Sequence, residues 1–148
     1  MTIFLLLVHA ICSMLLLGAI THQAVAIWWA PAGPTQGWWG AIRRVHPDRY
    51  SAAIASLFVA TFVLGAVLYG PFRVAVRASY LDAHAPWATG LFEIKEHAAA
   101  LGLALLPGYL LAWRTPDDSG RRGITTFLTV LCWWNFLVGH VVNNVRGL

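Results

Sequence analysis

The sequence predicts an all-α integral membrane protein whose four membrane-spanning helices form one bundle. Of its 148 residues, 59% are hydrophobic and 11% are charged, whereas about 25% of the residues in a soluble domain are charged. The apolar residues gather in four segments that are long enough to cross roughly 30 Å of hydrocarbon as helices. The length allows one transmembrane domain, covering residues 1–148, and no separate soluble domain.

The four predicted spans follow one another with short polar connections, apart from a longer first loop. The second span is expected to stop near Gly70 and Pro71, because proline lacks the N–H group that continues a helix. The third span is followed by a tight turn from Thr115 to Gly120, which makes the third and fourth spans an antiparallel hairpin. In order, the spans run from Ile3 to Trp28, Ser51 to Tyr69, Thr89 to Trp113, and Gly123 to Val145.

The distribution of arginines predicts how these spans are oriented. Cytoplasmic loops of membrane proteins carry an excess of basic residues. The first and third loops together carry six arginines and the opposite side carries three, so we expect both termini on the outer, periplasmic side of a bacterial inner membrane. The net charge of +4 therefore indicates loop anchoring and not nucleic-acid binding. The two sets are Arg43, Arg44, Arg49, Arg114, Arg121 and Arg122, and Arg73, Arg77 and Arg146.

Three histidines lie inside three different apolar segments at similar expected depth. His97 and His140 are almost equally far from the turn at Asp118, and His9 is a comparable distance from the start of the first span. All three are expected roughly 10 Å below the outer boundary, at about 1.5 Å of rise per residue. Ionisable side chains are costly in hydrocarbon and usually have a functional reason to be there. The sequence therefore predicts a buried cofactor or metal site.

The number of histidines decides which centre is expected. Two imidazoles on facing helices suit one haem b, with His97 and His140 as the first choice and His9 as the third candidate. Three imidazoles suit a metal ion such as copper. In either case no second haem is expected, because the inner halves of the second, third and fourth spans contain no histidine.

Charged residues on the outer side have predicted roles around this centre. Glu93 is four residues before His97, so both lie on one helix face and the carboxylate is expected to orient the imidazole. Arg73 and Arg77 are also four apart, in a stretch expected to form a short amphipathic helix at the membrane interface. Their guanidinium groups are candidates to pair with haem propionates, or to anchor to lipid headgroups.

Parts of the first and third spans resemble known families. His9 is followed by a stretch containing Gly18 and Ala19, and Lys95 and His97 stand close together in the third span. This pattern resembles small four-helix membrane proteins of the copper-resistance D type and the bacterial membrane protoporphyrinogen oxidase. The resemblance implies a four-helix haem-binding membrane fold and, for the oxidase, an enzyme that uses His9 and Lys95.

The leading functional hypothesis is a haem b subunit that carries electrons between quinone and other membrane or periplasmic redox subunits. Such a subunit has no catalytic residue of its own, because bis-histidine iron has no open position for a substrate. The alternatives are a membrane copper or metal-site subunit, a protoporphyrinogen-oxidase-like enzyme, and a non-redox structural subunit of a larger complex.

Overall fold

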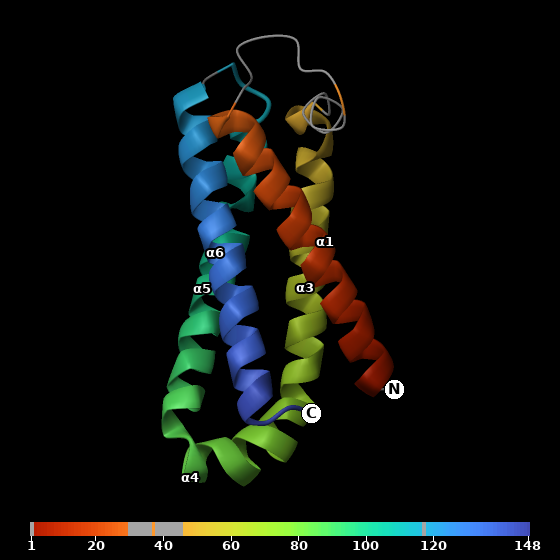
Figure 1. Cartoon of the computed structure of the whole chain (residues 1–148), viewed down its shortest axis with the longest axis vertical. Coiled ribbons are helices and arrows are strands. Elements are labelled where there is room, and N and C mark those ends of the chain that lie inside the picture. Colours follow the sequence, from red (N-terminus) through yellow and green to blue (C-terminus); the bar gives the residue numbers. More distant parts are fainter. Residues whose placement is uncertain (1, 30–36, 38–45, 117) are drawn as a thin grey trace.

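The computed structural model describes residues 2–29, 37, 46–116 and 118–148, and every regular element among them is helical. Four long helices lie side by side and three short helical segments connect or precede them (Figure 1). The long helices are α1 (Thr2–Trp28), α3 (Ser51–Phe72), α5 (Pro86–Ala112) and α6 (Asp118–Val145). The short segments are the 3-10 helix η1 (Pro47–Tyr50), the π-helix η2 (Arg73–Leu81) and α4 (Asp82–His84).

Three helical segments in the described part of the chain are long and apolar enough to cross a membrane. They are Ile3–Trp28, Pro47–His84 and Ser119–Val145, which correspond to the first, second and fourth predicted spans. Helix α5 has 27 residues and sufficient length, but three charged residues, Glu93, Lys95 and Glu96, interrupt its apolar sequence. The predicted all-helical class is therefore confirmed, as is the apolar character of three of the four spans.

Helix α3 ends at Phe72, close to the predicted stop near Gly70 and Pro71, but the chain stays helical beyond it. Helix α3 contains Pro71 and continues to Phe72, because the N–H of Arg73 donates to the carbonyl of Tyr69 and carries the hydrogen-bond ladder past the proline. The chain then widens into the π-helix η2, whose end is marked by the N–H of Asp82 donating to the Arg77 carbonyl five residues back. The expected short helix around the two arginines is thus present, joined directly to α3.

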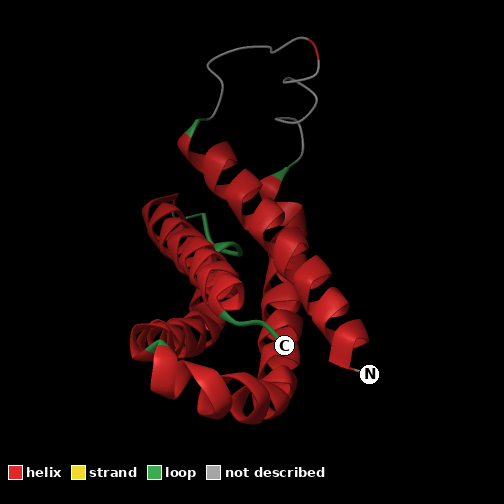
Figure 2. Cartoon of the chain, turned by 60° about the horizontal axis from the view of Figure 1, so that its bottom comes forward, coloured by secondary structure: helices red, strands yellow, loops and turns green. Residues whose placement is uncertain are grey.

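Neighbouring helices pack in a defined order. Helices α5 and α6 form a hairpin, α1 contacts α3 and α6, and α3 contacts α5. In Figure 1 both termini lie at the same end, and α1 diverges from α6 toward that end. Figure 2 shows η2 and α4 running across this end, between the end of α3 and the start of α5. A helical connection therefore crosses the terminal end of the fold.

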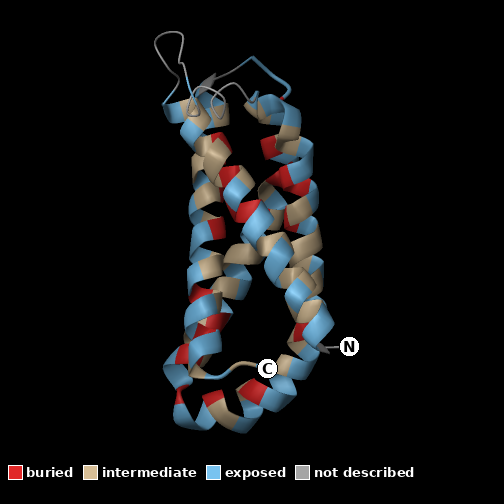
Figure 3. Cartoon of the chain, turned by 45° about the vertical axis from the view of Figure 1, so that its right-hand side comes forward, coloured by how far each residue is buried: buried red, intermediate tan, exposed pale blue. Residues whose placement is uncertain are grey.

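Two separate groups of buried side chains form the core. The larger group lies in the half of the molecule remote from the termini and includes Leu17, Ile54 and Tyr109. The smaller group lies where η2, the start of α5 and the end of α6 meet, and includes Val76 and Phe92. Figure 3 shows both concentrations of buried residues, with partly buried and exposed residues between them. The level between the two groups is where the cavity described below lies.

A buried polar cluster fixes α1 in the larger core group. Gln23 and Tyr109 are both 0% exposed, and the Tyr109 hydroxyl donates to Oε1 of Gln23 over 2.6 Å. The Gln23 amide in turn donates from Nε2 to the Pro47 carbonyl at 2.9 Å. The Gln23 side chain therefore joins α1 to both η1 and α5. Both polar atoms of its amide group have a hydrogen-bond partner.

Candidate functional site

A cavity of about 740 Å³ lies between the two core groups and is bounded by all four long helices. Its volume falls within the range of roughly 300–1,000 Å³ that is typical of ligand and cofactor sites. Most of its lining is apolar, with a few polar side chains converging from different helices. The polar lining residues are His9 and Ser13 of α1, Thr61 and Tyr69 of α3, Lys95 and Glu96 of α5, and Asn135, His140 and Asn143 of α6.

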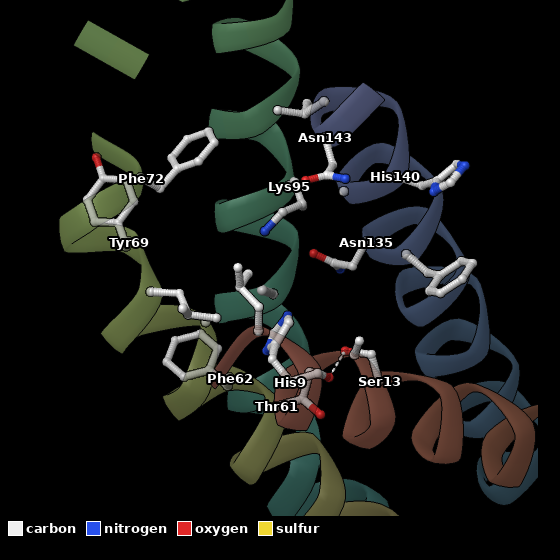
Figure 4. A pocket seen from close by; sticks show the side chains of 18 of the residues that line it. His9, Ser13, Thr61, Phe62, Tyr69, Phe72, Lys95, Asn135, His140 and Asn143 are labelled. Carbon is white, nitrogen blue, oxygen red and sulfur yellow. Dashed lines mark hydrogen bonds between the residues drawn. The ribbon is translucent and has the colours of Figure 1, made fainter. Parts of the chain in front are cut away.

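His9 is the histidine that faces the interior of this cavity (Figure 4). Its Nδ1 atom is buried and has no hydrogen-bond partner, although its backbone carbonyl accepts a hydrogen bond from Ser13 Oγ at 2.7 Å. Gly65 of α3 leaves room for the ring, since a Cβ atom there would stand 3.4 Å from Cε1 of His9. The groups that act electrostatically on the imidazole are Lys95, the backbone of Thr61 and Glu96. A nitrogen able to bind a ligand is therefore held in the cavity wall.

Two further residues of the cavity lining also carry a buried polar atom without a partner, namely Oγ1 of Thr61 and Oδ1 of Asn135. The orientation of the Asn135 amide is set by its Nδ2 group, which donates to the Leu131 carbonyl at 2.7 Å, because the Asn135 oxygen could not make that bond. Buried polar groups usually have partners, and those that lack them need an explanation. Three residues that line one cavity, from three different helices, thus each carry a buried polar atom without a partner.

Lys95 extends into the same space from α5. Its ammonium group is 2.9 Å from Oε1 of Glu96 and lies 4.7 Å from the centre of the Phe92 ring. A Cβ added at Gly139 of α6 would be 3.9 Å from Lys95 Cδ, so α5 and α6 approach each other closely at this level. The cavity lining thus brings the His9 imidazole together with one ammonium group and one carboxylate in apolar surroundings.

The three histidines do not meet at one centre. His140 lines the cavity, but its ring points away from His9 and Lys95 (Figure 4). His97 is exposed and is not among the lining residues, and its Nδ1 atom is 2.7 Å from the Glu93 carbonyl. Within the described residues, no group of three His, Cys, Asp or Glu side chains is arranged to hold a metal ion. Of the three candidates, His9 and His140 share the cavity.

Glu93 and Arg77 are brought together with each other and not with a histidine. Nη2 of Arg77 is 2.6 Å from the Glu93 carboxylate, Nε is 3.5 Å from Asp82, and Nη1 donates to the Tyr69 hydroxyl at 3.3 Å. The Glu93 carboxylate therefore pairs with the Arg77 guanidinium group. The backbone carbonyl of Glu93, and not its carboxylate, contacts the His97 ring. Arg73 is exposed on η2, and neither arginine lines the cavity.

Asn135 and Thr61 are cavity residues that the sequence-based predictions missed, and Lys95 was expected at a site only through the family resemblance. A signal for Lys95 was present, because Phe92, Lys95, Glu96 and Ala99 follow the spacing of one helical face and all line the cavity. His97 is two residues beyond Lys95, and at 3.6 residues per turn it lies on nearly the opposite side of α5. Equal depth along the helices therefore does not place two side chains in the same cavity.

The comparisons with known proteins do not add to this picture. No family model matches the sequence, and no curated protein or solved structure is significantly similar to it. The function of this chain is therefore inferred from the cavity and the helices around it.

Proposed function

We propose that this chain is a four-helix integral membrane protein that binds one haem b in the cavity beside His9 and carries electrons. The observation that supports this most directly is the buried, unpartnered Nδ1 atom of His9 in the wall of a large apolar cavity. Inside a membrane, an unsatisfied polar group costs several kcal/mol unless a ligand or another group bonds to it.

The arrangement of the helices supports four crossings and the predicted orientation. Three helices have membrane-spanning length and apolarity, and both termini lie at the same end of the molecule (Figure 1). Chain ends on the same side need an even number of crossings, so α5 completes the bundle. Arg114, Arg121 and Arg122 lie around the opposite end, at the turn between α5 and α6, which favours that end as cytoplasmic. A bacterial inner membrane fits this arrangement.

The cavity residues suit a flat, largely apolar group that carries acidic substituents. His9 would supply a nitrogen ligand to the iron, and His140 is the candidate for a second one, because it is the other histidine in the lining. Lys95 would attract the acidic substituents by its charge on exchanging its present partner Glu96, and the apolar walls would exclude water. When bound, haem b would supply an iron centre that exchanges single electrons. Electron exchange with quinone and with other redox subunits follows from this proposal.

Haem titration tests the proposal directly. We expect the purified protein in nanodiscs to bind iron protoporphyrin IX saturably, with one haem per chain and a shift of the Soret band. We also expect the midpoint of thermal unfolding to rise with haem concentration, because a ligand that binds only the folded state stabilises it. A linear, non-saturating absorbance increase with no change in the unfolding midpoint would contradict the proposal.

A second function is favoured by one observation, namely that His9 and Lys95 line the same cavity. This is the pair that the resemblance to the bacterial membrane protoporphyrinogen oxidase assigns to an enzyme. Formation of fluorescent porphyrin from protoporphyrinogen, with a loss of that activity in Lys95→Ala, would favour this enzyme over an electron-carrying subunit. Bound copper without haem would favour the metal-site alternative.

A further inference from the structure

Aromatic rings wall the cavity on the α3 and α5 side of its terminal end. There the stacked rings of Tyr69, Phe72 and Phe92 form part of the lining, with ring centres 5.8 Å apart for Tyr69 and Phe92 and 4.6 Å apart for Phe72 and Phe92. Behind them, Arg77 bonds to Tyr69, Glu93 and Asp82. These contacts tie η2 to both α3 and α5. An end wall of this kind opposes entry of a ligand from the water phase on that side.

The boundary between α1 and α6 is tied together along part of its length. Hydrogen bonds join Trp133 to Thr21 at 3.0 Å, Trp28 to Thr126 at 2.7 Å and Thr129 to the Ile20 carbonyl at 3.5 Å. Each of these bonds uses a residue of α1 from Ile20 onward. In the described part of α1, the first buried residue is Leu16, so the preceding turns contribute nothing to the two core groups.

The part of the boundary between α1 and α6 that lacks these hydrogen bonds forms a side wall of the cavity. Ile3, Leu7 and Met14 of α1 line the cavity while remaining 75%, 59% and 61% exposed. On α6, His140 also lines the cavity and is exposed. Side chains that face both the cavity and the exterior mark an opening between them. The opening is bordered mainly by apolar groups, and it lies where α1 diverges from α6 (Figure 1).

From this contrast we infer that the cavity exchanges its ligand with the lipid phase, through an opening between residues 3–14 of α1 and residues 136–143 of α6. This inference depends on the proposed function, since it takes the four helices to span a bilayer and the ligand to be haem b. A flat amphipathic molecule dissolved in the bilayer would pass between the apolar rims with no need to break the Arg77 contacts. His9, Thr61 and Asn135, whose buried atoms lack partners, would meet it inside.

The test compares loading from lipid with loading from water. Ala10 lines the cavity and is exposed at the rim, whereas its neighbour Ile11 is exposed and does not line the cavity. Ala10→Trp should therefore obstruct the opening, and Ile11→Trp is the matched control. The wild type and both variants, in nanodiscs, would receive iron protoporphyrin IX either from phosphatidylcholine vesicles or from an albumin complex in water. The Soret shift would be followed in time and to saturation.

We expect the wild type and Ile11→Trp to load faster from vesicles than from albumin, and Ala10→Trp to load from vesicles about tenfold more slowly. Equal rates for Ala10→Trp and Ile11→Trp, or faster loading of the wild type from albumin, would overturn the lateral route. If Ala10→Trp does not fold, Met14→Trp on the same rim takes its place. Absence of saturable binding to the wild type from either source would instead refute the proposed function itself.

Discussion

Replacing His9 with alanine is expected to abolish specific haem binding, whereas replacing His97 with alanine should leave it intact. His9 lines the cavity and carries a buried nitrogen without a hydrogen-bond partner. His97 is exposed and lies outside the cavity lining. Loss of an outer-shell partner of a metal ligand typically costs about 10–100-fold in affinity, so loss of the ligand itself should cost more. Titration of both variants with iron protoporphyrin IX measures the difference.

The pair of variants also provides its own control, because each removes one imidazole from a different long helix. A third variant, His140→Ala, should alter the visible spectrum and weaken binding less than His9→Ala does, since His140 lines the cavity but its ring points away from His9. If His97→Ala lost haem and His9→Ala kept it, the result would contradict His9 as the ligand. It would instead support His97, the ligand predicted from depth along the helices.

The largest loss of stability is expected from replacing Gln23 with leucine. This change leaves the fully buried Tyr109 hydroxyl without its acceptor and the Pro47 carbonyl without its donor. Each buried group left unpaired costs about 1–3 kcal/mol, so we expect a decrease of about 2–4 kcal/mol in the free energy of unfolding. Denaturant titration of the purified variant, with helical content as the signal, measures it.

A double variant separates the hydrogen bond from the shape of the side chain. In Gln23→Leu combined with Tyr109→Phe, the stranded hydroxyl is removed together with its acceptor. The double variant should therefore lose less stability than the sum of the two single variants. Gln23→Leu lying within about 0.5 kcal/mol of wild type would show that the buried cluster does not fix α1 in the core.

The helices themselves were largely predictable because their signals are local. A long apolar run between polar connections sets the limits of α1 within a residue of the predicted span, and a tight turn sets the α5–α6 hairpin. The continuation of α3 through Pro71 was not predictable in the same way. It depends on the N–H of Arg73 reaching the Tyr69 carbonyl, and on packing of Val76 and Leu81 in the smaller core group.

The candidate site was predictable only in part, for a geometrical reason. Counting residues from the helix ends estimates depth, but membership of a cavity also depends on which side of the helix a residue occupies. The count of residues from the helix ends predicted His97 as a ligand. The face of α5 that meets the cavity carries Lys95 and Glu96 instead. The unpartnered atoms of Thr61 and Asn135 could not be recognised from residue types, because threonine and asparagine in membrane helices commonly bond to nearby backbone carbonyls.

The visible spectrum of the wild-type protein, purified from the membranes of cells that produce it, tests most directly whether the cavity beside His9 holds haem b. We expect a Soret band and, in the reduced-minus-oxidised difference, a sharp α-band, with one haem per chain that is absent from His9→Ala. A colourless, metal-free wild-type protein that is folded and helical would contradict the proposal.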